Sequence, residues 1–311
     1  MRIASLLPSA TELVCAVGAK HELVGVSHEC DFPIDLGDLP ALTSTRLGAP
    51  ISSARIHAEV QGLVREVLSI YSVEEQALRA ARPDLIITQD LCDVCAVSRS
   101  DVDKALCALD MGDVTVLNLS PMRLHEVLDD LDRVGAALNR QEAASLARRA
   151  LEDRLDSLRE RTAGLTKRKV LTLEWINPLM VGGTWMPELI ECAGGAALIA
   201  RAGEHAPIIE ASILTDLDPA PDVVVVKPCG FPLTKTLEER GELRDLLGGL
   251  DWPAVREGRV YLADGNAYFN RPGPRLVESA EFLAACIHPE VFGDPAELFP
   301  GEAIKLELNA K

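Results

Sequence analysis

Residues 82–89 read RPDLIITQ, and residues 221–228 read PDVVVVKP. In both stretches a continuous apolar run follows Pro-Asp, without the polar alternation of a strand that faces water on one side. Such a run is typical of a buried strand in a parallel sheet, and a helical pattern precedes each of the two. The recurrence predicts two similar α/β halves in which a polar loop follows the buried strand.

Shorter aliphatic runs extend the same alternation around both stretches. In the first half, strands are predicted at residues 2–7, 22–27 and 113–119. The alternation resumes after Gly164. Between the halves, residues 120–163 read as almost wholly helical, and the helix that starts near Asn139 should be roughly 33 Å long at 1.5 Å per residue.

We therefore predict two Rossmann-like lobes with parallel sheets, joined by a single long helix. The predicted divisions are an N-terminal α/β lobe at 1–120, a helical linker at 121–163 and a C-terminal α/β lobe at 164–311. Ligands of open α/β sheets bind outside the carboxyl ends of the strands. A ligand cleft is therefore expected between the lobes, lined by the strand-end loops of both.

The charge balance excludes some classes of partner. Lys and Arg number 31 and Asp and Glu number 48, which gives a net charge of −17. A field of that sign repels phosphate backbones and anionic lipid, so we expect no nucleic-acid partner. No run of 18 apolar residues occurs, so no membrane insertion is expected.

Cysteine usage and the first residues bear on location. The chain opens MRIASLLPSATELV, without a basic segment followed by a long apolar one. Several of the eight cysteines lie in apolar periodic stretches, and the set does not read as a disulfide framework. We therefore expect a cytoplasmic location, with a periplasmic or surface-anchored location as the alternative if a leader has been trimmed.

Four stretches in order carry a family resemblance. They are RIASLLPSATELVCAVGAKHELVGVSHECDFP (2–33), ARPDLIITQ (81–89), NPLMVGGTWMPELIECAGG (177–195) and FNRPGPRLVESAEFLAACI (269–287). Together they resemble the ABC-type cobalamin and iron-siderophore substrate-binding proteins, and the cobalamin-binding branch most closely. The resemblance runs from residue 2 to about residue 288.

The resemblance implies two lobes on a long helix, limited hinge motion and an ABC permease as partner. It also implies aromatic side chains that stack against a corrin ring from both lobes. Tyr268 stands where that branch has a cleft tryptophan. Gln89 and Glu29 depart from the pattern, because the branch has a tryptophan and a tyrosine near those positions.

The candidate ligand contacts lie mainly on loops that follow predicted strands. An aromatic ring there can offer a flat apolar face, and a neutral imidazole can donate a nitrogen to cobalt, zinc or iron. Ser9 and Glu12 form a capping-box pattern, whose helix start offers backbone N–H groups. The candidates are Pro8, Ser9, His28, Glu29, Gln89, Asp90, Trp175, Trp185, His205, Tyr268, Phe269 and Arg271.

For the aromatic candidates a structural role stays open. Tyr268 and Phe269 could instead pack beneath the last helix, and Trp185 could cover the helix that it precedes. His28 could be an ordinary hydrogen-bonded histidine at a strand end. These alternatives predict buried rings and internally satisfied polar atoms.

A metal site is the alternative interpretation of TQDLCDVCAVS (88–98). Cys92 and Cys95 have C-x-x-C spacing, but a closed zinc site needs four ligands. His28 and Cys30, after a different strand, would complete a Cys₃His set if the two strand ends are neighbours. The competing interpretation is a thiol-lined rim of the ligand cleft.

The leading functional hypothesis is a non-catalytic binding protein for a corrinoid, cobalamin, acting as a monomeric carrier. The first alternative is an iron-siderophore or haem-like chelate on the same fold. The second is a metal-dependent enzyme or metallochaperone. No nucleophile elbow, P-loop or dinucleotide fingerprint occurs, so we expect no catalytic cofactor.

Overall fold

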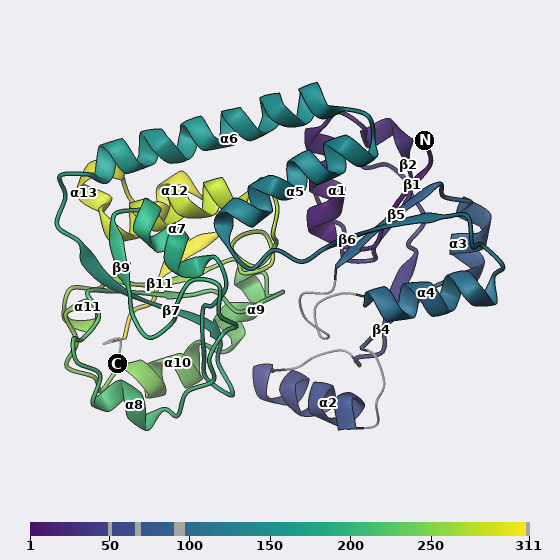
Figure 1. The fold of residues 1–311 in the computed structure, drawn as a ribbon. Helices are drawn as coiled ribbons and strands as arrows, with labels where there is room; N and C mark the ends of the chain where they lie inside the picture. The colour runs from purple at the N-terminus through teal and green to yellow at the C-terminus, as the bar shows by residue number, and fades with distance from the viewer. Residues whose placement is uncertain (49–51, 66–69, 90–96, 309–311) are drawn as a thin grey trace.

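The computed structural model describes residues 1–48, 52–65, 70–89 and 97–308. Figure 1 shows two groups of strands, with helix α6 (Gln141–Thr162) running along one side of both. The first group comes from the N-terminal half of the chain and the second from the C-terminal half. The predicted two-lobed α/β architecture is confirmed.

The N-terminal sheet is parallel throughout. Its order is β2-β1-β5-β6, so the chain starts in the middle of the sheet. All five residues of β5 are buried, which confirms RPDLIITQ as a central strand. The strands are β1 (Ile3–Ser5), β2 (Leu23–Val26), β5 (Leu85–Gln89) and β6 (Thr115–Leu119).

Helices and one antiparallel hairpin surround this sheet. The hairpin joins β3 (Thr43–Thr45) to β4 (Tyr71–Val73). Strand β4 takes up residues 71–73, and helix α3 begins at Glu75 directly after it. The helices are α1 (Pro8–Ala16), the single 3-10 turn η1 (Lys20–Glu22), α2 (Ser53–Arg65), α3 (Glu75–Ala81) and α4 (Arg99–Ala108).

The start of α1 differs from the predicted capping box. Leu7 is the N-cap and makes no side-chain cap bond, and Pro8 occupies the first turn. The Glu12 carboxylate instead binds arginines of the C-terminal lobe. A carboxylate binds a guanidinium more strongly than a backbone N–H. Glu12 therefore pairs with these arginines and does not cap the helix.

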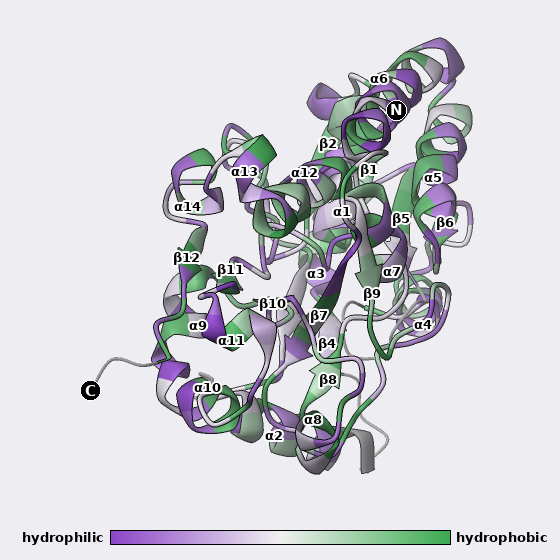
Figure 2. Cartoon of the chain, turned by 90° about the vertical axis from the view of Figure 1, so that its left-hand side faces the viewer, coloured by the Kyte–Doolittle hydropathy of each residue, from purple (hydrophilic) through white to green (hydrophobic). Residues whose placement is uncertain are grey.

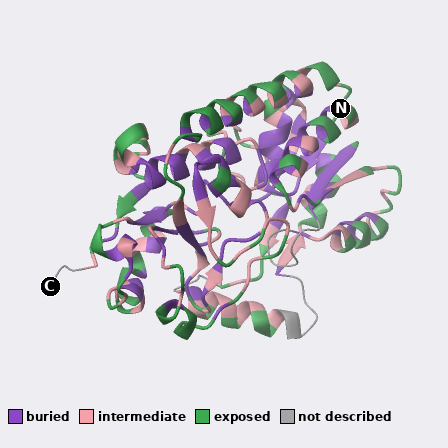
Figure 3. Ribbon diagram, turned by 60° about the vertical axis from the view of Figure 1, so that its left-hand side comes forward, coloured by how far each residue is buried: buried purple, intermediate pink, exposed green. Residues whose placement is uncertain are grey.

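Two helices form the link between the lobes. Helix α5 (Leu124–Ala137) packs against α6, and α6 has 22 residues, as the long-helix prediction requires. The inner side of α6 buries a leucine stripe that includes Leu151, Leu155 and Leu158. Figure 2 shows hydrophobic and hydrophilic residues alternating around both helices, and Figure 3 shows the exposed residues of α6 on its outer side.

The C-terminal sheet has a parallel centre and antiparallel edges. Its order is β12-β11-β10-β7-β8, and β9 also pairs with β7. The four valines of β10 are all buried, which confirms PDVVVVKP as a central strand. The edge strands β8 and β12 run antiparallel, so this sheet departs from the all-parallel prediction. The strands are β7 (Arg168–Trp175), β8 (Met180–Val181), β9 (Gly195–Ala197), β10 (Val223–Val226), β11 (Val260–Ala263) and β12 (Ala303–Lys305).

Helix α12 (Leu276–Ile287) is the most buried helix of this lobe and packs against both α6 and α7. Most of its residues are buried, and the two that are not, Glu278 and Glu281, form ion pairs with Arg154 of α6. The other helices are α7 (Met186–Cys192), α8 (Ser212–Thr215), α9 (Leu233–Glu238), α10 (Arg240–Leu247), α11 (Pro253–Arg256), α13 (Pro289–Phe292) and α14 (Pro295–Leu298).

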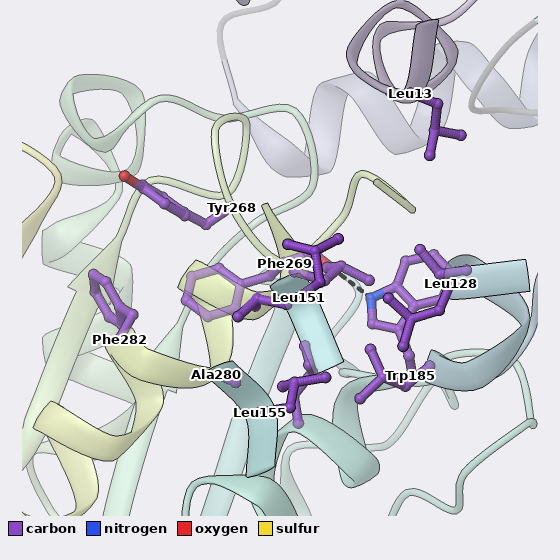
Figure 4. Packing of buried hydrophobic residues seen from close by; sticks show 14 of the residues in the cluster. Leu13, Leu128, Leu151, Leu155, Trp185, Tyr268, Phe269, Ala280 and Phe282 are labelled. Atoms are coloured by element: carbon purple, nitrogen blue, oxygen red, sulfur yellow. Dashed lines mark hydrogen bonds between the residues drawn. The ribbon is translucent and has the colours of Figure 1, made fainter. Parts of the chain in front are cut away.

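One hydrophobic cluster continues from one lobe into the other. Leu13 of α1, Leu151 of α6 and Phe282 of α12 all belong to it. Figure 4 shows part of this cluster, with Leu151 and Leu155 between Phe269 and Trp185, Phe282 to one side and Leu13 above them. Each large apolar side chain buried here contributes about 1.5–3 kcal/mol. The lobes are therefore held together by core packing along the α6 side.

Candidate ligand-binding site between the two lobes

A polar network joins the strand-end loops of the two sheets. Asp31, in the loop after β2, accepts bonds from Arg271 Nη2 at 3.0 Å and from Asn266 Nδ2 at 2.8 Å. Both partners lie in the loop after β11. The carboxyl ends of β2 and β11 therefore face each other, as expected for a ligand site shared by both sheets.

Glu12 provides a second link at the same place. Its side chain is 2% exposed and accepts from Arg275 Nη2 at 2.7 Å and from Arg275 Nε at 3.1 Å. Arg271 lies 3.7 Å from the same carboxylate. The Arg275 guanidinium also covers the Phe32 ring at 4.2 Å. The two arginines are thus neutralised by carboxylates of the other lobe.

The Asp31–Arg271 pair is reflected in the pKa values of both groups. Burial acts to raise the pKa of Asp31, but the Arg271 guanidinium outweighs it and holds that pKa below its usual range. Burial acts to lower the pKa of Arg271, and the bond to Asp31 outweighs it and raises that pKa. Both groups stay charged at neutral pH.

A further inter-lobe contact involves the start of α2. Ser53 donates to Glu239 through its backbone N at 2.5 Å and through Oγ at 2.6 Å. Glu239 lies between α9 and α10, and both side chains are buried. The N-terminal N–H groups of a helix need acceptors, and α2 has no acidic residue of its own in its first turn. The C-terminal lobe therefore caps a helix of the N-terminal lobe.

His28 and Glu29 follow β2 and lie near the β3–β4 hairpin. His28 is exposed, and its Nδ1 lies 2.8 Å from Thr43 Oγ1. The Tyr71 hydroxyl donates to Glu29 Oε1 at 2.9 Å, and the Tyr71 and His28 ring centroids are 5.6 Å apart. The structure therefore brings these two candidates together with Tyr71, which sequence reasoning missed.

The C-terminal lobe contributes a buried lysine to its strand ends. Lys227 follows β10, is fully buried, and donates to Glu174 Oε2 and Asn270 Oδ1, both at 2.8 Å. Trp175 ends β7; its Nε1 donates to Asn177 O at 3.1 Å, and its ring meets Phe231 edge-on at 5.2 Å. Trp175 is partly exposed and remains a candidate contact.

Three aromatic candidates lie in the core in this structure (Figure 4). Trp185 is 3% exposed and donates from Nε1 to Phe269 O at 2.7 Å. Phe269 is 1% exposed, and Tyr268, which is 8% exposed, bonds Glu302 through its hydroxyl at 2.6 Å. Burial, followed by that bond, raises the pKa of Tyr268. These rings present little surface to a ligand here, so ligand stacking by them stays a prediction.

The other candidates occupy varied positions. Ser9 is buried beneath the loop that contains Gly273, and Pro8 is half-buried beside it. His205 is exposed. Gln89 ends β5 with a buried side chain, and its Oε1 has no hydrogen-bond partner among the described residues. Ligand contact by these residues stays a prediction.

The Cys₃His hypothesis receives no support from the described residues. Asp90, Cys92 and Cys95 lie outside them. Cys30 Sγ lies 3.1 Å from Thr11 Oγ1, and burial raises the pKa of its thiol to about 11, whereas metals bind the thiolate. In residues 1–48, 52–65, 70–89 and 97–308 no group of three His, Cys, Asp or Glu side chains is placed to hold a metal ion.

Two hollows of the described part of the chain lie away from these loops. One, of about 760 Å³, is lined by Arg2, Gln76, Arg79, Ala80 and Arg82. Another, of about 490 Å³, lies between α6, α12 and α14. Neither contains a candidate residue, so the site is defined by the contacts between the strand-end loops.

Comparison with known proteins places this geometry in context. The family model described as periplasmic binding protein matches residues 3–267. The chain is 23% identical over 300 residues to an uncharacterised ABC transporter substrate-binding lipoprotein, YvrC, of Bacillus subtilis, covering 94% of this chain and 81% of that protein.

Solved structures show the same fold. A periplasmic haem-binding protein from Pseudomonas aeruginosa superposes with a TM-score of 0.69 at 22% identity, covering 93% of both chains. The haem-binding protein RhuT from Roseiflexus gives 0.67 at 21% identity, covering 95% of this chain and 99% of that one. The vitamin B12-binding protein BtuF of Vibrio cholerae gives 0.63 at 19% identity, covering 92% and 96%.

These findings correct the expected cytoplasmic location. The matching family consists of periplasmic binding proteins, and the curated relative is a lipoprotein, so both point to a location outside the cytoplasm. The prediction was wrong because it relied on the first residues and on cysteine usage, and neither reports on where the family acts. Among the described residues, no helix has both the length and the apolar character needed to cross a membrane.

Proposed function

The chain belongs to the periplasmic binding protein family, and on that premise we propose that it is the substrate-binding protein of an ABC transporter for a corrinoid, cobalamin. The ligand is held between the lobes by the strand-end loops, and the partner is an ABC permease. The role is binding and delivery without catalysis. The vitamin B12-binding protein BtuF has the same fold as this chain, and this likeness supports the proposal.

One observation favours a corrinoid over an anionic chelate. The cations at the inter-lobe loops are already paired: Arg271 with Asp31, Arg275 with Glu12, and Lys227 with Glu174. The three cations are largely buried, at 10%, 12% and 0% exposure, so a ligand that carries carboxylates would have to displace the partners of buried cations, which is costly. The side chains of cobalamin are mostly neutral amides, which hydrogen-bond without displacing an ion pair.

A haem-like or iron chelate is the second candidate. The fold neighbours include two haem-binding proteins with TM-scores of 0.69 and 0.67. Haem carries propionates, so this candidate requires cations other than the paired ones. The exposed imidazoles of His28 and His205 are the groups that could serve a metal chelate.

Parallel titrations test the proposal. Cyanocobalamin, haemin and a ferric siderophore should each be titrated into the full chain and followed by calorimetry and visible absorbance. We expect cyanocobalamin to bind most tightly and to be displaced weakly by the other two. Dissociation constants above about 50 μM for all three would overturn the proposal, since that affinity corresponds to only about 6 kcal/mol.

A further inference from the structure

The hydrogen bonds behind His28 determine which ring nitrogen carries its proton. The Thr43 hydroxyl donates to Ser27 Oγ at 3.0 Å. The same Thr43 oxygen lies 2.8 Å from His28 Nδ1 and accepts from the His28 backbone N at 3.2 Å. A hydroxyl has one proton, and here that proton is given to Ser27. His28 Nδ1 must therefore be the donor.

The opposite nitrogen is then unprotonated. In a neutral imidazole with the proton on Nδ1, Nε2 carries a free lone pair. Thr43 is 2% exposed and Ser27 is 5% exposed, so the orienting hydroxyls lie in the interior while the ring itself is exposed. Among the described residues, no contact to Nε2 is recorded. This arrangement matches the second shell of a metal-binding histidine, in which the far ring nitrogen donates to a fixed acceptor.

The surroundings favour a chelated metal over a free ion. A free ion needs several protein ligands, and the described part of the chain holds no cluster of three donor side chains. A metal in a porphyrin or corrin ring already has four equatorial nitrogens and accepts an axial ligand from the protein. The hydroxyl of Tyr71, whose ring lies beside that of His28, is directed to Glu29.

We propose that His28 Nε2 is an axial ligand to the metal of the bound chelate, with Thr43 and Ser27 as the residues that position it. This inference rests on the proposed function and applies to tetrapyrrole-type chelates with an exchangeable axial position, which cyanocobalamin does not have. The chemistry is shared by porphyrin iron and corrin cobalt, and the probes below distinguish the two.

The tautomer can be tested without any ligand. Long-range nitrogen-15 NMR of the free protein should show His28 protonated on Nδ1. Thr43→Val removes the acceptor, and the ring should then shift toward the Nε2-protonated form that free histidine prefers. An Nε2-protonated ring in the parent protein would overturn the inference.

Matched probes test the coordination itself. Haemin is compared with metal-free protoporphyrin, and aquacobinamide with dicyanocobinamide, whose axial positions are blocked. His28→Ala should weaken binding of the exchangeable metal probe about tenfold or more and remove its spectral shift, while the metal-free or blocked probe binds both proteins equally. Thr43→Val should weaken the same probe by about tenfold. His21→Ala is the control, because His21 lies before β2 and His28 lies after it, at the other end of the same strand. This variant should keep the affinity and the spectral shift of the parent.

The outcomes separate the two proposals. Binding without a spectral shift, or equal affinity of the parent and His28→Ala, overturns the axial role and leaves the binding function intact. Failure of the parent to bind any of the four probes overturns the axial role, and the cyanocobalamin titration then decides separately whether the binding function stands. Loss of the shift in His28→Ala alone among the histidine variants supports both.

Discussion

Glu12 and Arg275, which lie 263 residues apart in the sequence, are joined by two hydrogen bonds across the lobe interface. Glu12 is 2% exposed and Arg275 is 12% exposed. Their pairing ties α1 of one lobe to the start of α12 in the other, next to the continuous hydrophobic cluster. It should therefore affect stability more than the surface ion pairs do.

Removing one partner of this pair should destabilise the fold strongly. Glu12→Ala leaves the largely buried Arg275 without its carboxylate partner, which should lower the free energy of unfolding by about 3–5 kcal/mol in urea denaturation. Glu12→Ala combined with Arg275→Met should recover part of that loss. Asp103→Ala, which breaks the exposed Arg99–Asp103 pair, is the control and should cost under about 1 kcal/mol. Equal losses for the two single variants would contradict the argument.

The Ser53–Glu239 contact should control how long a ligand stays bound. Ser53→Ala and Glu239→Ala each remove bonds that exist only while the lobes are together, so each should raise the ligand dissociation rate by about tenfold, which corresponds to about 1.4 kcal/mol. The double variant should be little worse than either single one. Ser52→Ala removes a bond within the same helix turn and should leave the rate unchanged. Stopped-flow dilution of bound cyanocobalamin measures all four.

Asp130 should make stability depend on pH. Burial raises its pKa to about 6, against the opposing effect of Arg133, and Oδ2 has no described hydrogen-bond partner. Since the folded-state pKa lies above the unfolded one, the protonated form is favoured by folding. Its contribution is present below the unfolded-state pKa and is lost as pH rises through about 6.

Asp130→Asn should remove this dependence. Relative to the parent, the variant should gain up to about 2 kcal/mol of unfolding free energy at about pH 7.5 and show no gain at about pH 4. Asp153→Asn, at an exposed position of α6, is the control and should give no trend. Chemical denaturation across that pH range is the measurement, and a gain that is the same at both ends would contradict the assigned cause.

The proposed metal-binding role of Cys92 and Cys95 can be tested by substituting both residues. We expect Cys92→Ser with Cys95→Ser to keep ligand affinity and metal content and to melt within about 2 °C of the parent, because Cys30 is held as a buried thiol. Elemental analysis and calorimetry measure this. Loss of one equivalent of zinc together with several kcal/mol of stability would reinstate the Cys₃His site.

The elements that sequence reasoning located are those with strong periodicity. β5 and β10 are continuous apolar runs, and α6 repeats leucines at helical spacing, so local pattern alone was enough. The short edge strands β8 and β12 were missed because a strand of two or three residues has no period to detect.

Only part of the candidate site could be predicted from the sequence in the same way. The strand-end position of His28 and the cation Arg271 could be read from the sequence. The pairing of Glu12 with Arg275 could not, because nothing local distinguishes a helix-capping glutamate from one that binds across lobes. Trp185 and Phe269 follow the family pattern but lie in the core, and burial of a ring beside a loop is decided by distant helices such as α12.

The shared hydrophobic cluster has a consequence for how the chain can be divided. Leu13, Leu151 and Phe282 belong to one buried cluster although they come from three distant parts of the sequence. A gene cut in the segment between α6 and β7 would give two fragments, each with an apolar face that its own residues cannot cover. Each fragment expressed by itself should aggregate. When both are expressed together, they should associate through these apolar faces and form the native fold from two chains.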